Sequence, residues 1–157
     1  MTAFLVPPEV FEEGRTTKRP FRYDQAPRLA YLELTQACDL ACQHCRADAV
    51  ARRHPLELST LEWKNVLREL RRFGDPPVHV VFTGGDPLHR EDLFELLEFA
   101  LTLGLGVSVA PAATPRLTRA VLQRFREMGV HGISLSLDGS SAEKHDTFRR
   151  VPLTNAT

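Results

Sequence analysis

Short runs of β-branched and apolar residues alternate with segments of helical periodicity along most of this chain. The runs cover about 28–34, 78–83, 106–111 and 132–137, and the last three begin 28 and 26 residues apart. This spacing is typical of a regular repeat of a strand followed by a helix. Such repeats form parallel sheets with helices packed on them. The alternation therefore predicts an α/β fold with a parallel sheet and about four βα units.

The segments between these runs carry helix signals. Apolar residues fall on one face of a helix expected over 59–73, where Ser59 and Glu62 fit a capping box at its start. A fourth helix is expected to begin at Ser140, with Glu143 completing a second capping box. The other two helices are expected over about 90–103 and 116–128.

The length of the chain limits how far the repeat extends. A complete eight-unit barrel of the TIM type needs about 250 residues, whereas this chain has 157. We therefore expect residues 28–157 to form an incomplete, partial TIM-type barrel. Residues 1–27 hold four prolines and no long periodic segment, so they are expected to form an irregular N-terminal arm.

The charge balance excludes some classes of partner. Lys+Arg and Asp+Glu both number 20, which gives a formal net charge of zero. Proteins that bind nucleic acid or anionic membranes carry an excess or a stripe of positive charge. We therefore expect neither as a partner. The start of the chain lacks the basic residues of a signal peptide, and the uncharged stretch 99–115 is too short to span a membrane, so a cytoplasmic location is expected.

All three cysteines lie within eight positions, directly after the first predicted strand: Cys38, Cys42 and Cys45. An odd, tightly grouped set in a chain without an export signal is a poor disulfide framework and a better metal or cluster site. Three thiolates suit a 4Fe–4S cluster, whose fourth iron would lack a cysteine and could bind another group. The alternative is a non-catalytic zinc or interaction module that adds His44 to the same cysteines.

Two further motifs follow predicted strands, where the loops of parallel α/β folds build the active face. In FTGGDP, 82–87, two glycines let the backbone approach a ligand, and Asp86 offers an acceptor for a cationic group. Alternatively, Asp86 caps a helix that starts at Pro87. In SLSLDGSS, Ser136 and Asp138 lie on the same side of a strand. They could hydrogen-bond a ribose, or they could be polar residues that lead into a helix cap.

Together these motifs resemble those of the radical S-adenosylmethionine (SAM) superfamily, over about Leu29 to Arg150. In that family, three cysteines hold a 4Fe–4S cluster and SAM chelates the fourth iron. By position, the three cysteines match these ligands. The segment FTGGDP matches a GGEP-type motif that contacts the amino group of SAM. Ser136 matches a hydroxyl at the end of a strand that contacts SAM in some members. The cofactor-binding residues expected from the motifs are Gly84, Gly85, Asp86, Pro87, Ser136 and Asp138.

The resemblance also implies an activity. A reduced cluster passes one electron to the sulfonium of SAM, which yields methionine and a 5′-deoxyadenosyl radical that takes a hydrogen atom from the substrate. The partners implied are an electron donor and an unidentified substrate, a peptide or a small molecule. The motifs are most similar to those of members that modify peptides or work in haem and other cofactor pathways. No side-chain acid, base or nucleophile is required, so no catalytic residue is assigned.

The chain departs from the family pattern in length and at a few positions. The family core is usually a partial barrel of six βα units, and about four are present here. We therefore expect a truncated or split member, the N-terminal part of the core domain, which needs a partner chain to complete the barrel or is inactive. Asp86 replaces the commoner glutamate, His44 stands in place of another aromatic residue, and 110–113 lacks a Thr-Asn-Gly turn.

Overall fold

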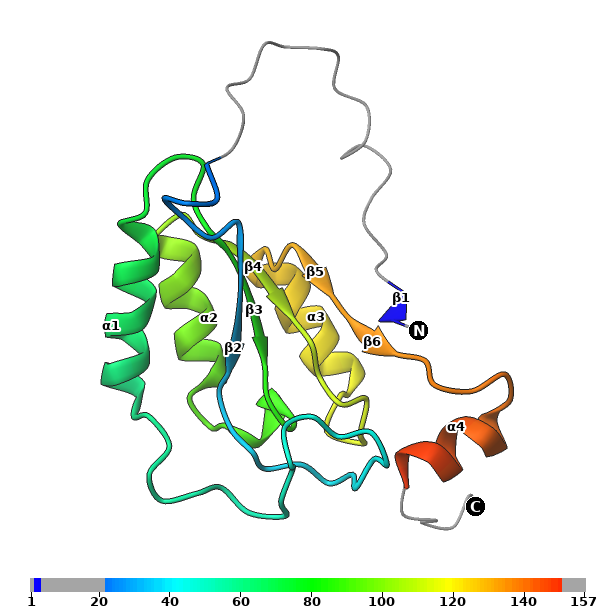
Figure 1. The fold of residues 1–157 in the computed structure, drawn as a ribbon. Coiled ribbons are helices and arrows are strands. Elements are labelled where there is room, and N and C mark those ends of the chain that lie inside the picture. The colour runs from blue at the N-terminus through cyan, green and yellow to red at the C-terminus, as the bar shows by residue number, and fades with distance from the viewer. Residues whose placement is uncertain (1, 4–21, 151–157) are drawn as a thin grey trace, which may run out of the picture.

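The computed structural model describes residues 2–3 and 22–150, and within them four parallel strands form one sheet (Figure 1). The strands lie in the order β2-β3-β4-β5, so neighbours in the sheet are also successive along the chain. This is the order of strands in a barrel wall. The predicted α/β fold with four βα units is confirmed. The strands are β2 (Leu29–Glu33), β3 (His79–Thr83), β4 (Gly106–Val109) and β5 (Gly132–Ile133).

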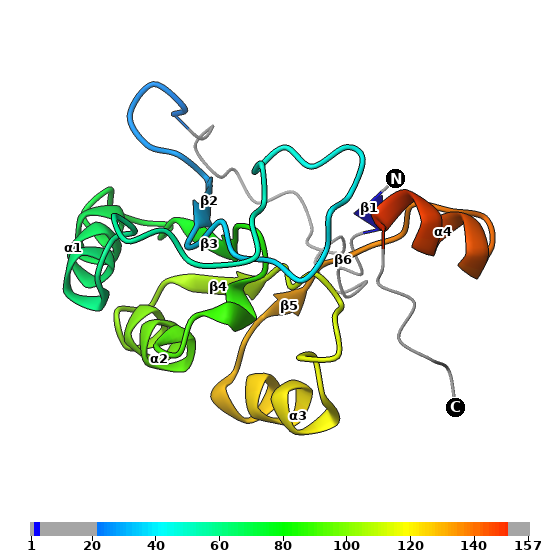
Figure 2. The same cartoon turned by 90° about the horizontal axis from the view of Figure 1, so that it is seen from below.

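Three helices cover one face of this sheet. Figure 2 looks onto the carboxyl ends of the strands and shows α1, α2 and α3 along that face, while the segment between β2 and α1 passes over the strand ends. The described helices are all too short or too polar to serve as membrane spans. The helices are α1 (Thr60–Arg71), α2 (Leu93–Thr102), α3 (Arg119–Met128) and, after the last strand, α4 (Ala142–Arg149).

The predicted helix starts are correct for α1 and wrong for α4. The capping box of Ser59 and Glu62 is present at α1. At α4, Ser141 rather than Ser140 is the N-cap, and its hydroxyl accepts the N–H of Lys144. Ser141 has the extended backbone, with φ −142° and ψ 160°, that a capping side chain needs to reach back to the first turn. The capping-box spacing favoured Ser140, because Glu143 lies three residues after it, whereas the residue three after Ser141 is Lys144.

Alternating residues of the central strands form the core. One side of each strand faces the helices, because successive side chains point to opposite faces of a sheet. On the other side, Tyr31 and Glu33 of β2 are exposed and face the concave side of the partial barrel. The buried cluster includes Val80, Phe82, Val107, Val109, Leu93, Leu96, Leu97 and Phe125.

The last predicted strand, 132–137, is divided in two. Ser134 separates β5 from β6 (Leu135–Ser136), and β6 pairs antiparallel with β1 (Thr2–Ala3). The N-terminal residues therefore occupy an edge of the last strand. The predicted arm over 1–27 lies mostly outside the described residues, apart from β1 and 22–27.

Candidate functional site

A pocket of about 430 Å³ lies at the carboxyl ends of the strands. The cysteine loop (38–50) after β2, the glycine turn (84–86) after β3 and the end of β6 all contribute to its lining, and these are places where the sequence predicts functional groups. Residues 110–112 after β4 and Arg149 of α4 line it as well. Among the expected site residues, those that line the pocket are Cys38, Cys42, Cys45, Gly84, Gly85 and Ser136.

The three cysteines are free thiols around this pocket. The Sγ of Cys38 accepts the N–H of Leu40 at 3.4 Å, and the Sγ of Cys45 accepts the N–H of Ala49 at 3.4 Å. Backbone donors of this kind stabilise thiolate ligands and tune bound iron–sulfur clusters. The donor set and its surroundings therefore fit a cluster with one iron left open.

Protonation of these thiols is linked to metal binding. Burial raises the pKa of the Cys38 thiol above its ordinary value. Burial also raises the pKa of Cys42, where the positive charge of Arg149 partly offsets it. Because a thiol must lose its proton to become a ligand, binding of metal at these residues must release protons.

His44, the residue considered as a fourth zinc ligand, contacts α4. Its ring stacks on that of Phe148, with centroids 4.7 Å apart and planes at 14°, and its Nε2 lies 3.9 Å from Oδ1 of Asp138. The backbone N–H of Gln43 donates to the carbonyl of Phe148 at 3.0 Å, so His44 is part of the contact between the cysteine loop and α4. Across the described residues, no three cysteine, histidine or acidic side chains are arranged to hold one metal ion.

The glycine turn lies directly against the four residues that precede Cys38, which we call the loop root (34–37). Gly85 and Asp86 donate their N–H groups to carbonyls of the loop root, each at 2.7 Å. A Cβ on Gly84 would lie 2.3 Å from the carbonyl oxygen of Thr35, and one on Gly85 would lie 2.4 Å from that of Ala37. The glycines are therefore needed for close approach to the protein's own backbone, and they line the pocket as well.

Asp86 is fully buried and is not among the residues that line the pocket. Its Oδ1 accepts the N–H of Leu88 at 3.0 Å, and its Oδ2 accepts the hydroxyl of Thr114 at 3.0 Å. It is the N-cap of a short 3₁₀ helix, η2 (Pro87–His89), with Pro87 buried at the first position. This is the capping arrangement that the sequence left open as the alternative to a ligand contact.

Ser136 and Asp138 have different surroundings. Ser136 lines the pocket, whereas Asp138 accepts a hydrogen bond from Nη1 of Arg149 at 3.0 Å. Arg149 is only 6% exposed, donates from Nη2 to the carbonyl of Ala112 at 3.1 Å, and lines the pocket. Sequence reasoning missed Arg149, because nothing in the local pattern separates it from Arg150. It missed as well an ion pair at the pocket between Arg46 and Glu33, 2.7 Å apart.

Comparisons with known proteins agree with this arrangement. A family model described as the Radical SAM superfamily matches residues 32–155. An AdoMet-dependent heme synthase from Oleidesulfovibrio alaskensis is 46% identical over 127 residues, which cover 81% of this chain and 32% of the relative. A PqqA peptide cyclase from Rhodopseudomonas palustris is 40% identical over 116 residues, which cover 74% of this chain and 30% of the relative. The chain thus spans about a third of the length of these curated relatives.

A solved structure has a similar fold. Streptococcus suis SuiB bound to S-adenosylmethionine superposes with a TM-score of 0.56 at 19% identity, over 69% of this chain and 24% of that chain. At this identity the likeness concerns the fold alone, a partial TIM-type barrel. Because the family match covers most of the chain, from the end of β2 past α4, the chain belongs to the radical SAM superfamily.

Proposed function

We propose that this chain is the N-terminal part of a radical SAM enzyme, in which Cys38, Cys42 and Cys45 hold a 4Fe–4S cluster and SAM occupies the adjoining pocket. The observation that carries the proposal is that the three thiols and the glycine turn line one pocket of about 430 Å³. A cluster with an open iron would supply one electron for the reductive cleavage of SAM to methionine and a 5′-deoxyadenosyl radical. Membership in the family supports this chemistry.

The residues of this chain bind and orient the two cofactors. The cysteines bind iron as thiolates, and the N–H groups of Leu40 and Ala49 stabilise the charge on two of the sulfur atoms. Gly84 and Gly85 bring the turn after β3 to the pocket, where its backbone is available to the amino group of SAM. The hydroxyl of Ser136 faces the same pocket and is available to the ribose.

Two residues that were expected to contact SAM, Asp86 and Asp138, support the pocket indirectly in this proposal. Asp86 fixes the glycine turn by capping η2 and bonding Thr114. Asp138 holds the guanidinium of Arg149 at the pocket. A fixed positive charge there offsets the negative charge of the thiolates.

The substrate of the whole protein is proposed from its relatives. Three of them, 38–46% identical to this chain, are named AdoMet-dependent heme synthase, so a haem precursor is the first candidate class. A PqqA peptide cyclase and the mycofactocin maturases make a peptide the second. In either case an electron donor is required, and the remaining strands would come from a further part of the same polypeptide or from a partner chain.

The test is anaerobic reconstitution of the purified chain with iron and sulfide. About four irons per chain are expected, and Cys38→Ser, Cys42→Ser or Cys45→Ser should each reduce this number, whereas His44→Ala should not. If the chain takes up zinc but never iron and sulfide, and His44→Ala abolishes zinc binding, the zinc-module alternative replaces the proposal. Formation of 5′-deoxyadenosine after reduction with SAM, measured by chromatography, then distinguishes an active chain from one that needs completion.

A further inference from the structure

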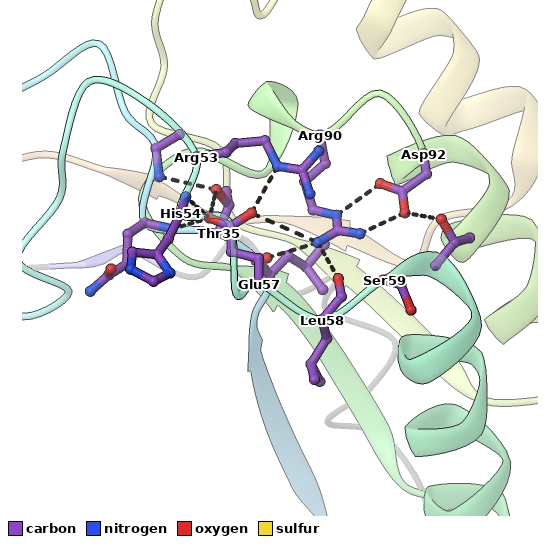
Figure 3. Close-up of polar contacts among 12 residues, drawn as sticks. Thr35, Arg53, His54, Glu57, Leu58, Ser59, Arg90 and Asp92 are labelled. Carbon is purple, nitrogen blue, oxygen red and sulfur yellow. Dashed lines mark hydrogen bonds and ion pairs between the residues drawn. The ribbon is translucent and has the colours of Figure 1, made fainter.

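A second group of polar side chains contacts the loop root (Figure 3). Its centre is formed by Glu57, which follows the cysteine loop, and Arg90, which follows η2. Their side chains are 9% and 1% exposed. Neither residue stands out in the sequence, and neither lines the pocket. Their partners converge on the segment that leads into Cys38.

Glu57 gathers four donors. Its Oε1 accepts the hydroxyl of Thr35 at 2.6 Å and the backbone N–H groups of Gln36 at 3.2 Å and His54 at 3.3 Å. Its Oε2 accepts Nε of Arg53 at 2.8 Å. Burial alone raises the pKa of this carboxyl, but the hydrogen bonds, led by that from Thr35, outweigh burial and hold the pKa below its ordinary value. The carboxylate is therefore ionised and saturated with donors.

Arg90 joins the same segment to both neighbouring helices. Its Nη1 donates to the carbonyls of Leu34 at 3.1 Å and Leu58 at 3.0 Å, and lies 4.0 Å from Oε2 of Glu57. Its other two nitrogens form a two-point ion pair with Asp92 at 2.8 and 2.6 Å. Asp92 is the N-cap of α2, and it also accepts the hydroxyl of Thr60, the first residue of α1. The guanidinium thus fixes the end of β2 relative to α1 and α2.

Two groups of contacts hold the loop root. Gly85 and Asp86 of the glycine turn donate to its carbonyls, whereas Glu57 accepts the N–H of Gln36 and Arg90 donates to the carbonyl of Leu34. The hydroxyl of Thr35 links Glu57 to the backbone of the loop root, since it donates to Glu57 and accepts the N–H of Ala37 at 3.0 Å, one residue before Cys38.

We propose that Thr35, Glu57 and Arg90 are positioning residues that hold Cys38 against the glycine turn before any cluster binds. Buried ion pairs contribute little net stability compared with apolar side chains of the same volume, so their value lies in geometry. Here the hydroxyl of Thr35 joins the carboxylate of Glu57 to the backbone N–H of Ala37, the residue before Cys38. As far as the cluster is concerned, this inference rests on the proposed function.

The direct test is alkylation of Cys38 in the folded, metal-free chain, followed by mass spectrometry. Thr35→Val keeps the shape of the side chain and removes the hydroxyl, which leaves buried partners unpaired. We expect Cys38 to react about tenfold faster, as local opening becomes easier. Thr35→Ser restores the hydroxyl and should stay within about twofold of the parent chain. Equal rates for the valine variant and the parent overturn the proposal.

A matched control separates positioning from a general loss of stability. Val107→Ala removes core volume on β4, which β3 separates from β2 in the sheet. If it accelerates Cys38 as much as Thr35→Val at the same loss in melting temperature, the effect is global and the proposal fails. Should Thr35→Val not fold, as judged by circular dichroism, Glu57→Gln takes its place. Its control is Glu69→Gln, which changes an exposed pair with Arg72.

The loaded chain gives a second readout. In Thr35→Val that has taken up iron and sulfide, the SAM concentration that half-saturates the change in the cluster spectrum should rise about fivefold, and Thr35→Ser should match the parent chain. An unchanged SAM response in the valine variant contradicts the positioning role and leaves the proposed function intact. A parent chain that never takes up iron contradicts the proposed function instead, and the alkylation rates then decide the positioning role.

Discussion

Gly85 donates its backbone N–H to the carbonyl oxygen of Thr35 at 2.7 Å, so the turn after β3 lies directly on the segment that leads into the first cysteine. A Cβ at Gly85 would lie 2.4 Å from the carbonyl oxygen of Ala37 and 2.6 Å from that of Gln36. These are backbone atoms of a hydrogen-bonded segment and cannot move independently. The cysteine motif and the glycine motif are therefore parts of one structural unit.

The first prediction concerns this contact. Gly85→Ala should lower the free energy of unfolding by about 1–3 kcal/mol, because the added methyl group forces two backbone segments apart. Gly132→Ala is the control, since its Cβ would meet only the hydroxyl oxygen of Ser108 at 3.2 Å. Urea denaturation followed by circular dichroism measures both. If the two variants lose similar amounts of unfolding free energy, the close approach of the backbones at Gly85 does not exclude a side chain there, and the prediction is contradicted.

The second prediction concerns Asp86 as a cap. Asp86→Ala and Thr114→Val should each reduce stability by about 1–3 kcal/mol, because each leaves a buried polar partner unpaired. Since the two residues bond each other at 3.0 Å, the double variant should lose less than the sum. A double-mutant cycle in urea measures this coupling. Strict additivity would contradict the hydrogen bond as a source of stability.

The elements of the fold were predictable because their signals are local. Strand runs and amphipathic faces need only neighbouring residues, and the order of alternation implies a parallel sheet. The predicted ends of helices were less accurate where contacts with distant residues determine them. The second helix begins at Leu93 rather than near 90, because Asp86 caps a separate turn of 3₁₀ helix and Arg90 is buried between segments.

The candidate site also contains residues that could be predicted from local sequence and residues that could not. Cys38, Cys42 and Cys45 could be found from spacing alone, since the pattern needs no knowledge of the fold. Arg90 and Arg149 could not, because sequence patterns place arginine at the surface. Their burial depends on backbone carbonyls far along the chain, such as that of Leu34, 56 residues from Arg90.

The third prediction concerns the attachment of α4 to the cysteine loop. Arg149→Met should lower stability by about 1–3 kcal/mol, because Asp138 and the carbonyl of Ala112 lose a donor in a buried place. Amides of α4 should then exchange hydrogen faster. Lys144→Met, at an exposed position of the same helix, should leave exchange unchanged. Equal protection in both variants would contradict the anchoring role of Arg149.

The fourth prediction concerns pH. Burial lowers the pKa of His79 below its ordinary value of 6.5, and the nearby His131 lowers it further. Below pH 6.5 the unfolded chain therefore binds a proton at this residue before the folded chain does, so stability falls as the pH drops through this range.

Urea midpoints measured between pH 7.5 and 5.5 test this fourth prediction. His79→Gln should show a shallower loss than the parent chain over the same range, because the variant has no group to protonate at that position. The comparison is made within one range so that carboxylates with low pKa values, such as Glu57, stay ionised in the folded state. Parallel curves for the two proteins would contradict a lowered pKa for His79.

The most direct test of the central claim is a titration of the reduced, reconstituted chain with SAM, followed by electron paramagnetic resonance. A cluster held by Cys38, Cys42 and Cys45 has an iron that SAM can bind, so the spectrum should change in a saturable way. Adenosine, which lacks the amino and carboxylate groups of the methionine part of SAM, should leave it unchanged. A cluster whose spectrum ignores SAM, or a chain that forms no iron–sulfur cluster at all, would contradict the account.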